Sequence, residues 1–199
     1  MNADEQGRLL QWARGAMERA VRGEPPLTIP AGELTGSVCE PHAAFVTLKK
    51  DGELRGCIGQ MDFARLLWEN VLGAAVAAAL EDSRFEPVTP AELPALHLEI
   101  SVLEPPVDLP LLADFDPQRH GIIVQHGFHR ALLLPKVAQE YGWNARQVLE
   151  CVCEKAGLAA EAWRDPALHW QVFTAIDFGE TPRQNSQQRS TGGQHVGED

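Results

Sequence analysis

Apolar residues recur at helical spacing in some stretches of this chain and alternate with polar residues in others. Segment 4–22 places apolar residues three and four positions apart with charged residues opposite, which predicts an amphipathic helix. Segment 96–103 alternates strictly and predicts a strand with one buried face. Segments 63–80 and 144–156 predict two more helices, the second with a capping box of Asn144 and Gln147 at its start. The first is apolar almost all round beyond Asn70, so we expect it in the interior.

Turn signals join several strands into hairpins. Asp51-Gly52 suits a type I′ turn, because both central residues of that turn need positive φ. If these two residues form the loop, Lys50 faces Glu53, Leu48 faces Arg55 and Val46 faces Cys57.

The second half of the chain is predicted to hold another hairpin, within 122–134 around His126-Gly127, and a short helix over 135–141. A final strand is predicted over 170–178. The long segment 104–120 either has a functional role or contains a short helix or strand that the pattern does not show. Helices and hairpins without βαβ crossovers predict an α+β fold with a mostly antiparallel sheet flanked by helices.

Composition and charge narrow the class of protein. The chain has 199 residues, 44% of them hydrophobic, which suits one domain over residues 1–180. Its net charge of −11 argues against binding nucleic acid or an anionic membrane surface. The polar segment 181–199 should be a disordered tail.

The four cysteines form no CxxC pair or disulfide spacing, which indicates free thiols in a reducing compartment. The first residues show no signal peptide, and no apolar run reaches membrane-spanning length. We therefore expect a cytoplasmic protein.

Cys57 is the leading candidate for chemistry. It shares a strand face with Arg55 if side chains alternate, and Gly56 and Gly59 flank it. Asp62 can cap the next helix. A cysteine beside an arginine and near a helix N-terminus is the setting of a reactive thiolate. The alternative is a small buried apolar side chain.

Other residues are candidates for supporting roles. Arg55 could bind a carboxylate or phosphate, or form a cross-strand ion pair. Asp82 and Arg84, at the end of the apolar helix, are either a structural pair or part of a site. Cys57, Arg55 and Asp82 are thus the catalytic candidates. The candidates for ligand binding are Arg84, Gly56, Gly59, Ser101 and His120.

A metal site is not predicted. His120, His126 and His129 lie on and around the second hairpin, where two could converge, but no HExxH or Cys-His zinc pattern accompanies them. No phosphate-binding loop, dinucleotide fingerprint or nucleophile elbow is present either. We expect neither a metal nor a cofactor.

Several ordered motifs resemble those of the AMMECR family. They are FVTLKKDGELRGCIG (45–59) with its hallmark LRGCIG, AALEDSRFEPVTPAELPAL (78–96), LEISVLEPP (98–106), HGIIV (120–124), ALLLPKVAQEYGW (131–143) and CEKAGL (153–158). The chain departs from the family at Lys136, where Gln or Glu is more usual.

The resemblance implies an antiparallel sheet flanked by helices, in two unequal lobes with a cleft between them. It also implies a context, the AmmeMemoRadiSam system, with a Memo-like protein and a radical-SAM protein as partners. The activity of the family is uncharacterised, so two functions stay open. In the first, the chain is a component of that system and uses a Cys57-centred site on a small substrate. Alternatively, it is a non-catalytic binding or scaffold module whose LRGCIG corner contacts a protein partner or an anionic ligand.

Overall fold

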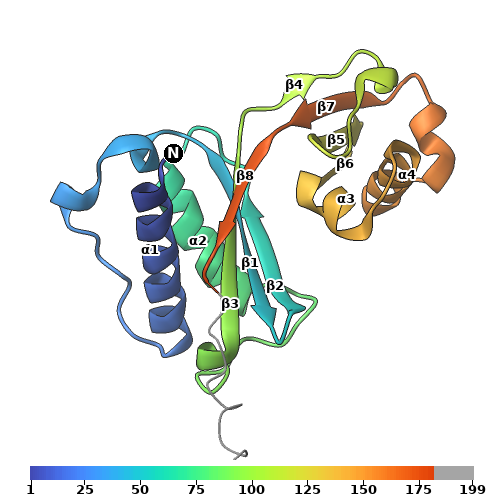
Figure 1. The fold of residues 1–199 in the computed structure, drawn as a ribbon. Coiled ribbons are helices and arrows are strands. Elements are labelled where there is room, and N and C mark those ends of the chain that lie inside the picture. The colour runs from blue at the N-terminus through green and yellow to red at the C-terminus, as the bar shows by residue number, and fades with distance from the viewer. Residues whose placement is uncertain (182–199) are drawn as a thin grey trace, which may run out of the picture.

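Two lobes, each built on a four-stranded antiparallel sheet, make up the computed structural model, which describes residues 1–181 (Figure 1). The α+β class is confirmed, although the sequence predicted one sheet rather than two. Nearly all of the predicted disordered tail lies outside the described residues.

The first lobe has strand order β2-β1-β3-β8. Its elements are α1 (Ala3–Val21), β1 (Ala43–Lys50), β2 (Glu53–Gln60), α2 (Leu67–Leu80), β3 (Leu96–Leu103) and β8 (Ala175–Gly179). The second lobe has strand order β4-β7-β5-β6. Its elements are β4 (Val107–Asp108), β5 (Gly121–His126), β6 (His129–Leu133), α3 (Pro135–Tyr141), α4 (Ala145–Lys155) and β7 (His169–Phe173). Short 3₁₀ turns lie at Ala31–Glu33, Gly36–Cys39, Leu93–Ala95, Leu112–Asp114 and Ala160–Arg164.

The α1 helix begins at a capping box formed by Asn2 and Glu5, which the apolar pattern of segment 4–22 did not predict. Asn2 accepts the N–H of Glu5, and Glu5 accepts the N–H of Asn2. The N–H groups of Asn2 and Ser37 donate to the Glu5 carboxylate and lower its pKa to about 2, the Asn2 bond most of all. The apolar stripe of α1 packs on α2, as its spacing predicted.

The α2 helix lies in the interior of the first lobe, as predicted, between α1 and the β1–β2 hairpin (Figure 1). It begins at Leu67, so the prediction of a helix from residue 63 is wrong. Asp62 does not cap it: its carboxylate accepts the N–H of Ala64 in a turn. Small side chains such as Ala74 and Ala78 are buried, whereas Leu72 and Val76 keep partial exposure.

The β1–β2 hairpin has the predicted turn, with positive φ at Asp51 (54°) and Gly52 (86°). Its register differs from the prediction beyond Lys50–Glu53, because a bulge intervenes between Leu48 and Lys49. Leu48 therefore pairs with Gly56 rather than Arg55. Thr47, rather than Val46, pairs with Cys57.

The predicted final strand 170–178 is two strands in different sheets. β7 ends at Phe173, and after Thr174 the chain enters the first lobe as β8. The other crossing follows β3, where the N–H of Glu104 donates to the carbonyl of Thr174 at 3.0 Å. Two adjacent chain segments thus connect the lobes.

In the second lobe the predicted long segment 104–120 holds β4 and one 3₁₀ turn. The α4 helix begins at the predicted Asn144–Gln147 capping box, and Gly157 follows it with φ +77°. Cys153 is fully buried in the core of this lobe. Burial raises the pKa of its thiol to about 11.

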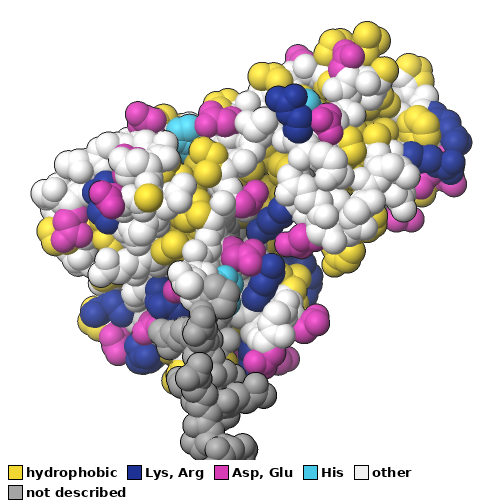
Figure 2. All heavy atoms as spheres, viewed as in Figure 1, with side chains coloured by type: hydrophobic (Ala, Val, Ile, Leu, Met, Phe, Trp, Pro, Cys, Tyr) yellow, Lys and Arg dark blue, Asp and Glu magenta, His cyan; other side chains and the backbone are white. Residues whose placement is uncertain are grey.

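The lobes meet through an apolar cluster and a group of charges, which we call the lobe junction. Its buried apolar residues come from both sheets: Ala43, Leu103, Ile123, Leu134 and Phe173. Its charges are Lys49 and Glu99 of the first lobe and Lys136 and Glu140 of α3. Figure 2 shows charged side chains of both signs gathered where the two lobes meet.

Candidate functional site

The backbone of Cys57 is held by two side chains from the turn after α2. Asp82 accepts the Cys57 N–H at Oδ2, at 2.8 Å, and Arg84 donates to the Cys57 carbonyl at 3.2 Å. Arg84 also forms a bidentate ion pair with Asp82. The hydrogen bond from Arg84 is the main reason that the pKa of Asp82 falls to about 2. Asp82 and Arg84 are thereby placed at the candidate site as a rigid pair.

The Cys57 sulfur lies on the other side of β2 from α2, in a chain of hydrogen bonds that begins in the second lobe. The Thr47 hydroxyl donates to Sγ at 3.3 Å, and Lys136 Nζ donates to that hydroxyl at 3.2 Å. Lys136 therefore directs the Thr47 proton at the sulfur. A thiolate is the form of cysteine that accepts such a bond best.

The two glycines of the motif allow close packing on opposite faces of β2. A Cβ at Gly56 would lie 2.1 Å from the carbonyl oxygen of Ala78, in the last turn of α2. A Cβ at Gly59 would lie 2.2 Å from the Phe45 ring. Both glycines are needed for packing, and Cys57 lies between these two contacts. The prediction of a helix N-terminus beside Cys57 is wrong, because the part of α2 that lies next to Gly56 and Cys57 is its C-terminal end.

Two positive groups lie near the thiol. The Arg84 side chain is 55% exposed, so part of its guanidinium faces solvent although it binds Asp82 and Cys57. Lys155, at the end of α4, donates to the Leu132 carbonyl at 3.0 Å. Its ammonium group interacts electrostatically with Cys57 and Arg84. Lys155 keeps exposed surface, yet partial burial of its ammonium lowers its pKa. Cys57 opposes this shift and Arg84 adds to it.

A four-charge network borders the sulfur on the side of the lobe junction. Glu99 binds Lys49 at 2.8 Å and Lys136 at 3.5 Å, and Lys49 reaches Glu140 at 3.5 Å. Burial alone would raise the pKa of Glu99, but the two lysines hold it below its usual value. The network fixes α3 against β1 and β3, and with it the position of Lys136.

Arg55 lies apart from the sulfur. Its guanidinium binds both carboxylate oxygens of Glu92, at 3.0 and 3.2 Å, and lies 6.0 Å from the centre of the Phe85 ring. Lys50 binds the same carboxylate at 3.2 Å. These partners hold the pKa of Glu92 well below its usual value, the Arg55 bond most of all. Arg55 thus forms an ion pair, but with a residue of the turn before Leu93 rather than across neighbouring strands as the alternative had it.

The remaining candidates are not gathered at Cys57. Ser101 is buried on β3 and donates to Asp177 of β8. His120 accepts the Asp116 N–H at 3.4 Å within its own loop, and His129 is bonded to the Ala156 carbonyl at 2.9 Å. His126 pairs with His129 across the hairpin. Within residues 1–181, no group of three His, Cys, Asp or Glu side chains is placed to hold a metal ion.

Sequence reasoning missed Thr47, Lys136 and Lys155 as members of the site. Thr47 gave a weak signal, as the polar residue on the outward face of the otherwise apolar stretch FVTL. Lys136 reaches Thr47 only because α3 packs beside the first lobe, and Lys155 comes within electrostatic range of Cys57 only through the placement of the end of α4. Local sequence could not place them there.

Comparison with known proteins identifies the family. The AMMECR1 family model matches residues 10–178, so the chain belongs to this family. It is 39% identical to a protein of Methanothermobacter thermautotrophicus over 186 residues, covering 90% of this chain and 96% of that protein. It is 40% identical to a protein of Thermococcus gammatolerans over 192 residues, covering 89% and 91% of the two chains.

The fold is shared with a solved structure, the uncharacterised protein PH0010 from Pyrococcus horikoshii. The TM-score is 0.82 at 34% identity, over 87% of this chain and 90% of that one. Among residues 1–181, no helix has both the length and the apolar character required to cross a membrane.

Proposed function

We propose that this chain is a component of the radical-SAM-associated AmmeMemoRadiSam system and that it uses the Cys57 thiol as a nucleophile toward a small anionic substrate. The observation that carries the chemical part is Cys57 itself, a partly exposed residue whose sulfur accepts a hydrogen bond from the Thr47 hydroxyl and which has Arg84 and Lys155 nearby. Partial exposure and positive surroundings are the two conditions that a reactive cysteine needs.

Each neighbour has a role in this proposal. Asp82 and Arg84 fix the Cys57 backbone, and the exposed part of the Arg84 guanidinium binds a carboxylate or phosphate group of the substrate. Lys155 adds a second positive charge. Thr47 and Lys136 hold the sulfur in place. The thiol loses its proton to solvent, and the thiolate attacks a carbon of the bound molecule that carries a leaving group. The bond from sulfur to carbon forms as the bond to the leaving group breaks, and that group departs with the electron pair.

The test compares two alkylating reagents of nearly equal size, anionic iodoacetate and neutral iodoacetamide. We expect Cys57 in the folded protein to react with both. Relative to the unfolded chain, the ratio of the two rates should shift toward iodoacetate because the site is positive. Peptide mapping distinguishes Cys57 from Cys39, Cys151 and Cys153, which serve as internal controls.

Lys155→Gln should reduce the preference for iodoacetate at Cys57. Arg146→Gln is the matched control, since Arg146 lies in the first turn of the same helix and binds Glu150. If Cys57 of the folded protein stays unlabelled at about pH 6–9 and labels normally after unfolding, the nucleophile role is excluded.

The alternative function is a binding module without chemistry, and the exposed part of the Arg84 guanidinium favours it. In that case Cys57→Ala would retain binding of an anion such as inorganic phosphate, and Arg84→Gln would lose it. The radical-SAM association rests on the family resemblance. It would be tested by co-purification of the full chain with a Memo-like and a radical-SAM protein from its own cells, and recovery of neither would contradict it.

A further inference from the structure

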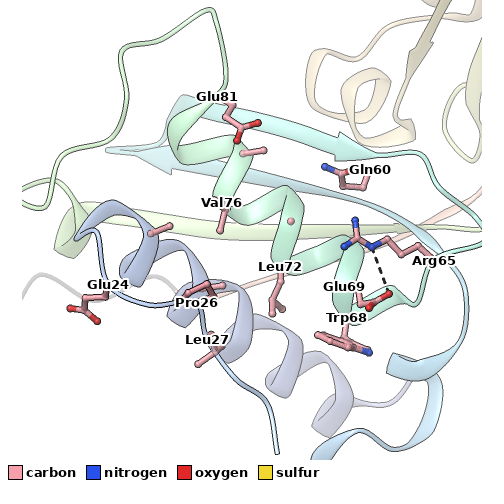
Figure 3. Close-up of a pocket in the computed structure, with 14 residues that line it drawn as sticks. Glu24, Pro26, Leu27, Gln60, Arg65, Trp68, Glu69, Leu72, Val76 and Glu81 are labelled. Atoms are coloured by element: carbon pink, nitrogen blue, oxygen red, sulfur yellow. Dashed lines mark ion pairs between the residues drawn. The ribbon is translucent and has the colours of Figure 1, made fainter.

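A groove runs along one face of α2 on the first lobe (Figure 3). Its volume is about 510 Å³, within the range of ~300–1,000 Å³ typical of small-molecule sites. Its walls come from α1, the segment after α1, α2 and the end of β2, and none of Cys57, Thr47 and Lys136 lines it. Its apolar lining includes Ala16, Ala20, Leu27, Trp68, Leu72 and Val76.

Gly73 leaves an unfilled space in this groove. It lines the groove from the middle of α2, where a glycine costs stability relative to alanine. Packing within residues 1–181 does not require it, because a Cβ there would meet only Gln60 Nε2, at 3.9 Å. Gly56, in contrast, has the Ala78 carbonyl oxygen 2.1 Å from the position of its Cβ. The space over Gly73 is therefore available to a ligand.

Two hydrogen-bond donors face this space. The Gln60 amide nitrogen borders it, and the Gln60 side chain makes no hydrogen bond with any described residue. The Arg65 side chain extends toward α2 beside Gln60 (Figure 3). Among the described residues its one partner is Glu69, 3.6 Å from Nε, which leaves the two terminal nitrogens of the guanidinium without a bond. Free donors, one group of them cationic, are complementary to a carboxylate.

Of the three carboxylates that line the groove, only Glu69 lies beside Arg65. Glu24 and Glu81 lie at separate edges of the groove, on the side where α1 and α2 end, and the Glu24 carboxylate points away from it (Figure 3). The contact between Glu69 and Arg65 is an ion pair without a hydrogen bond. An incoming carboxylate can therefore accept bonds from the free Arg65 nitrogens, while repulsion by Glu69 lowers its affinity.

We propose that this groove binds a medium-chain aliphatic carboxylate. The carboxylate group lies between Gln60 and Arg65, and the hydrocarbon chain extends over Gly73 along the apolar face of α2. The guanidinium fork and the amide N–H select the negative group, and the apolar walls supply affinity. The inference is independent of the chemistry proposed at Cys57, since the two sites share no residue.

The probe is octanoate, and its control is n-octylamine, which has the same chain length and the opposite charge. In nitrogen–proton correlation spectra of the full chain, octanoate should shift the side-chain amide resonances of Gln60 saturably, and octylamine should not. Gln60→Met assigns these resonances, and the other glutamine and asparagine amides are internal controls. Hexanoate should bind roughly five- to tenfold more weakly than octanoate, because two methylenes leave the apolar walls.

Two variants test the charged contact. Arg65→Gln should weaken octanoate binding about fivefold, because the guanidinium fork is lost. Glu69→Gln should strengthen it about twofold, because the competing carboxylate is lost. Arg22→Gln is the matched control and should have no effect. The Arg22 side chain is 44% exposed against 48% for Arg65, it also pairs with a glutamate one turn away, and it lies outside the groove.

Gly73→Leu tests the space over the glycine. The leucine side chain should fill the groove and abolish octanoate binding, and a melting temperature no lower than that of the unmodified chain shows that the variant is folded. Gln60 resonances that octanoate leaves unmoved, equal binding of octylamine, or undiminished binding in Arg65→Gln or in folded Gly73→Leu would overturn the proposal.

Discussion

Asp82 takes the place of a neighbouring strand for Cys57. β2 is the edge strand of its sheet, so the Cys57 N–H, which is not bonded to β1, would otherwise point into solvent. The Asp82 carboxylate accepts it at 2.8 Å, and Arg84, bound to the same carboxylate, donates to the Cys57 carbonyl. Both polar groups of one residue on a sheet edge are thereby satisfied, and Cys57 is fixed.

Asp82→Asn should lower the free energy of unfolding by about 1–3 kcal/mol. The Asp82 side chain is buried, and the substitution removes the charge that pairs with Arg84. The loss should depend on pH. The pKa of Asp82 is lowered from 3.8 to about 2, so its stabilisation is complete above 3.8 and disappears as the pH falls toward 2. Urea unfolding from about pH 2 to pH 7 measures both effects.

The control for Asp82 is Asp62→Asn, because Asp62 accepts only the exposed Ala64 N–H. That variant should follow the pH profile of the unmodified chain. If Asp82→Asn followed it as well, the Asp82–Arg84 pair would contribute nothing to stability.

Local sequence was sufficient where one segment contains the whole interaction. Asp51-Gly52 predicted its turn, and Asn144 with Gln147 predicted the start of α4. The bounds of strand 96–103 were also predicted correctly, and its alternation records burial on one side as far as Ile100, beyond which Ser101 and Leu103 are buried as well. In each case the partners lie within a few residues of one another.

Sequence was insufficient where the partner is distant. The bulge opposite Leu48 shifts Cys57 by one residue; Gly56 is a residue type that often marks a bulge inside a strand, but it does not fix the register. The alternation of side chains placed Arg55 beside Cys57, but its guanidinium binds Glu92, which follows α2 in the sequence. Lys155 comes within electrostatic range of Cys57 only because the end of α4 is placed on that side of the second lobe. Tertiary packing, not propensity, decides these positions.

Gly56→Ala should destabilise the first lobe by at least about 3 kcal/mol, since the added Cβ would lie 2.1 Å from a backbone oxygen that cannot move without displacing α2. Gly73→Ala is the matched control within α2. Its Cβ meets nothing closer than 3.9 Å, so it should stabilise the protein by about 0.5–1 kcal/mol. Thermal unfolding distinguishes the two, and a tolerated Gly56→Ala would contradict the tight packing of β2 on α2.

Lys136→Met should slow alkylation of Cys57 roughly two- to fivefold, because the Thr47 hydroxyl loses the donor that directs its proton at the sulfur. Lys136→Gln should retain most of the rate, since the amide N–H can donate to Thr47 in the same way. The labelling of Cys151 in the same sample is the control. Equal rates for the two variants would show that Lys136 acts only through its ion pair with Glu99.

Glu180→Gln should lower the free energy of unfolding by about 1–3 kcal/mol, which corresponds to roughly 3–10 °C in melting temperature. Glu180 forms a bidentate ion pair with Arg14 of α1 and accepts the Leu98 N–H at 3.0 Å, so it joins the end of β8 to both α1 and β3. The same pair raises the pKa of Arg14. A chain that ends after Thr181 keeps all these contacts and should melt at the temperature of the full chain. One that ends after Gly179 should resemble Glu180→Gln, and equal melting of all three would show that the pair does not anchor β8.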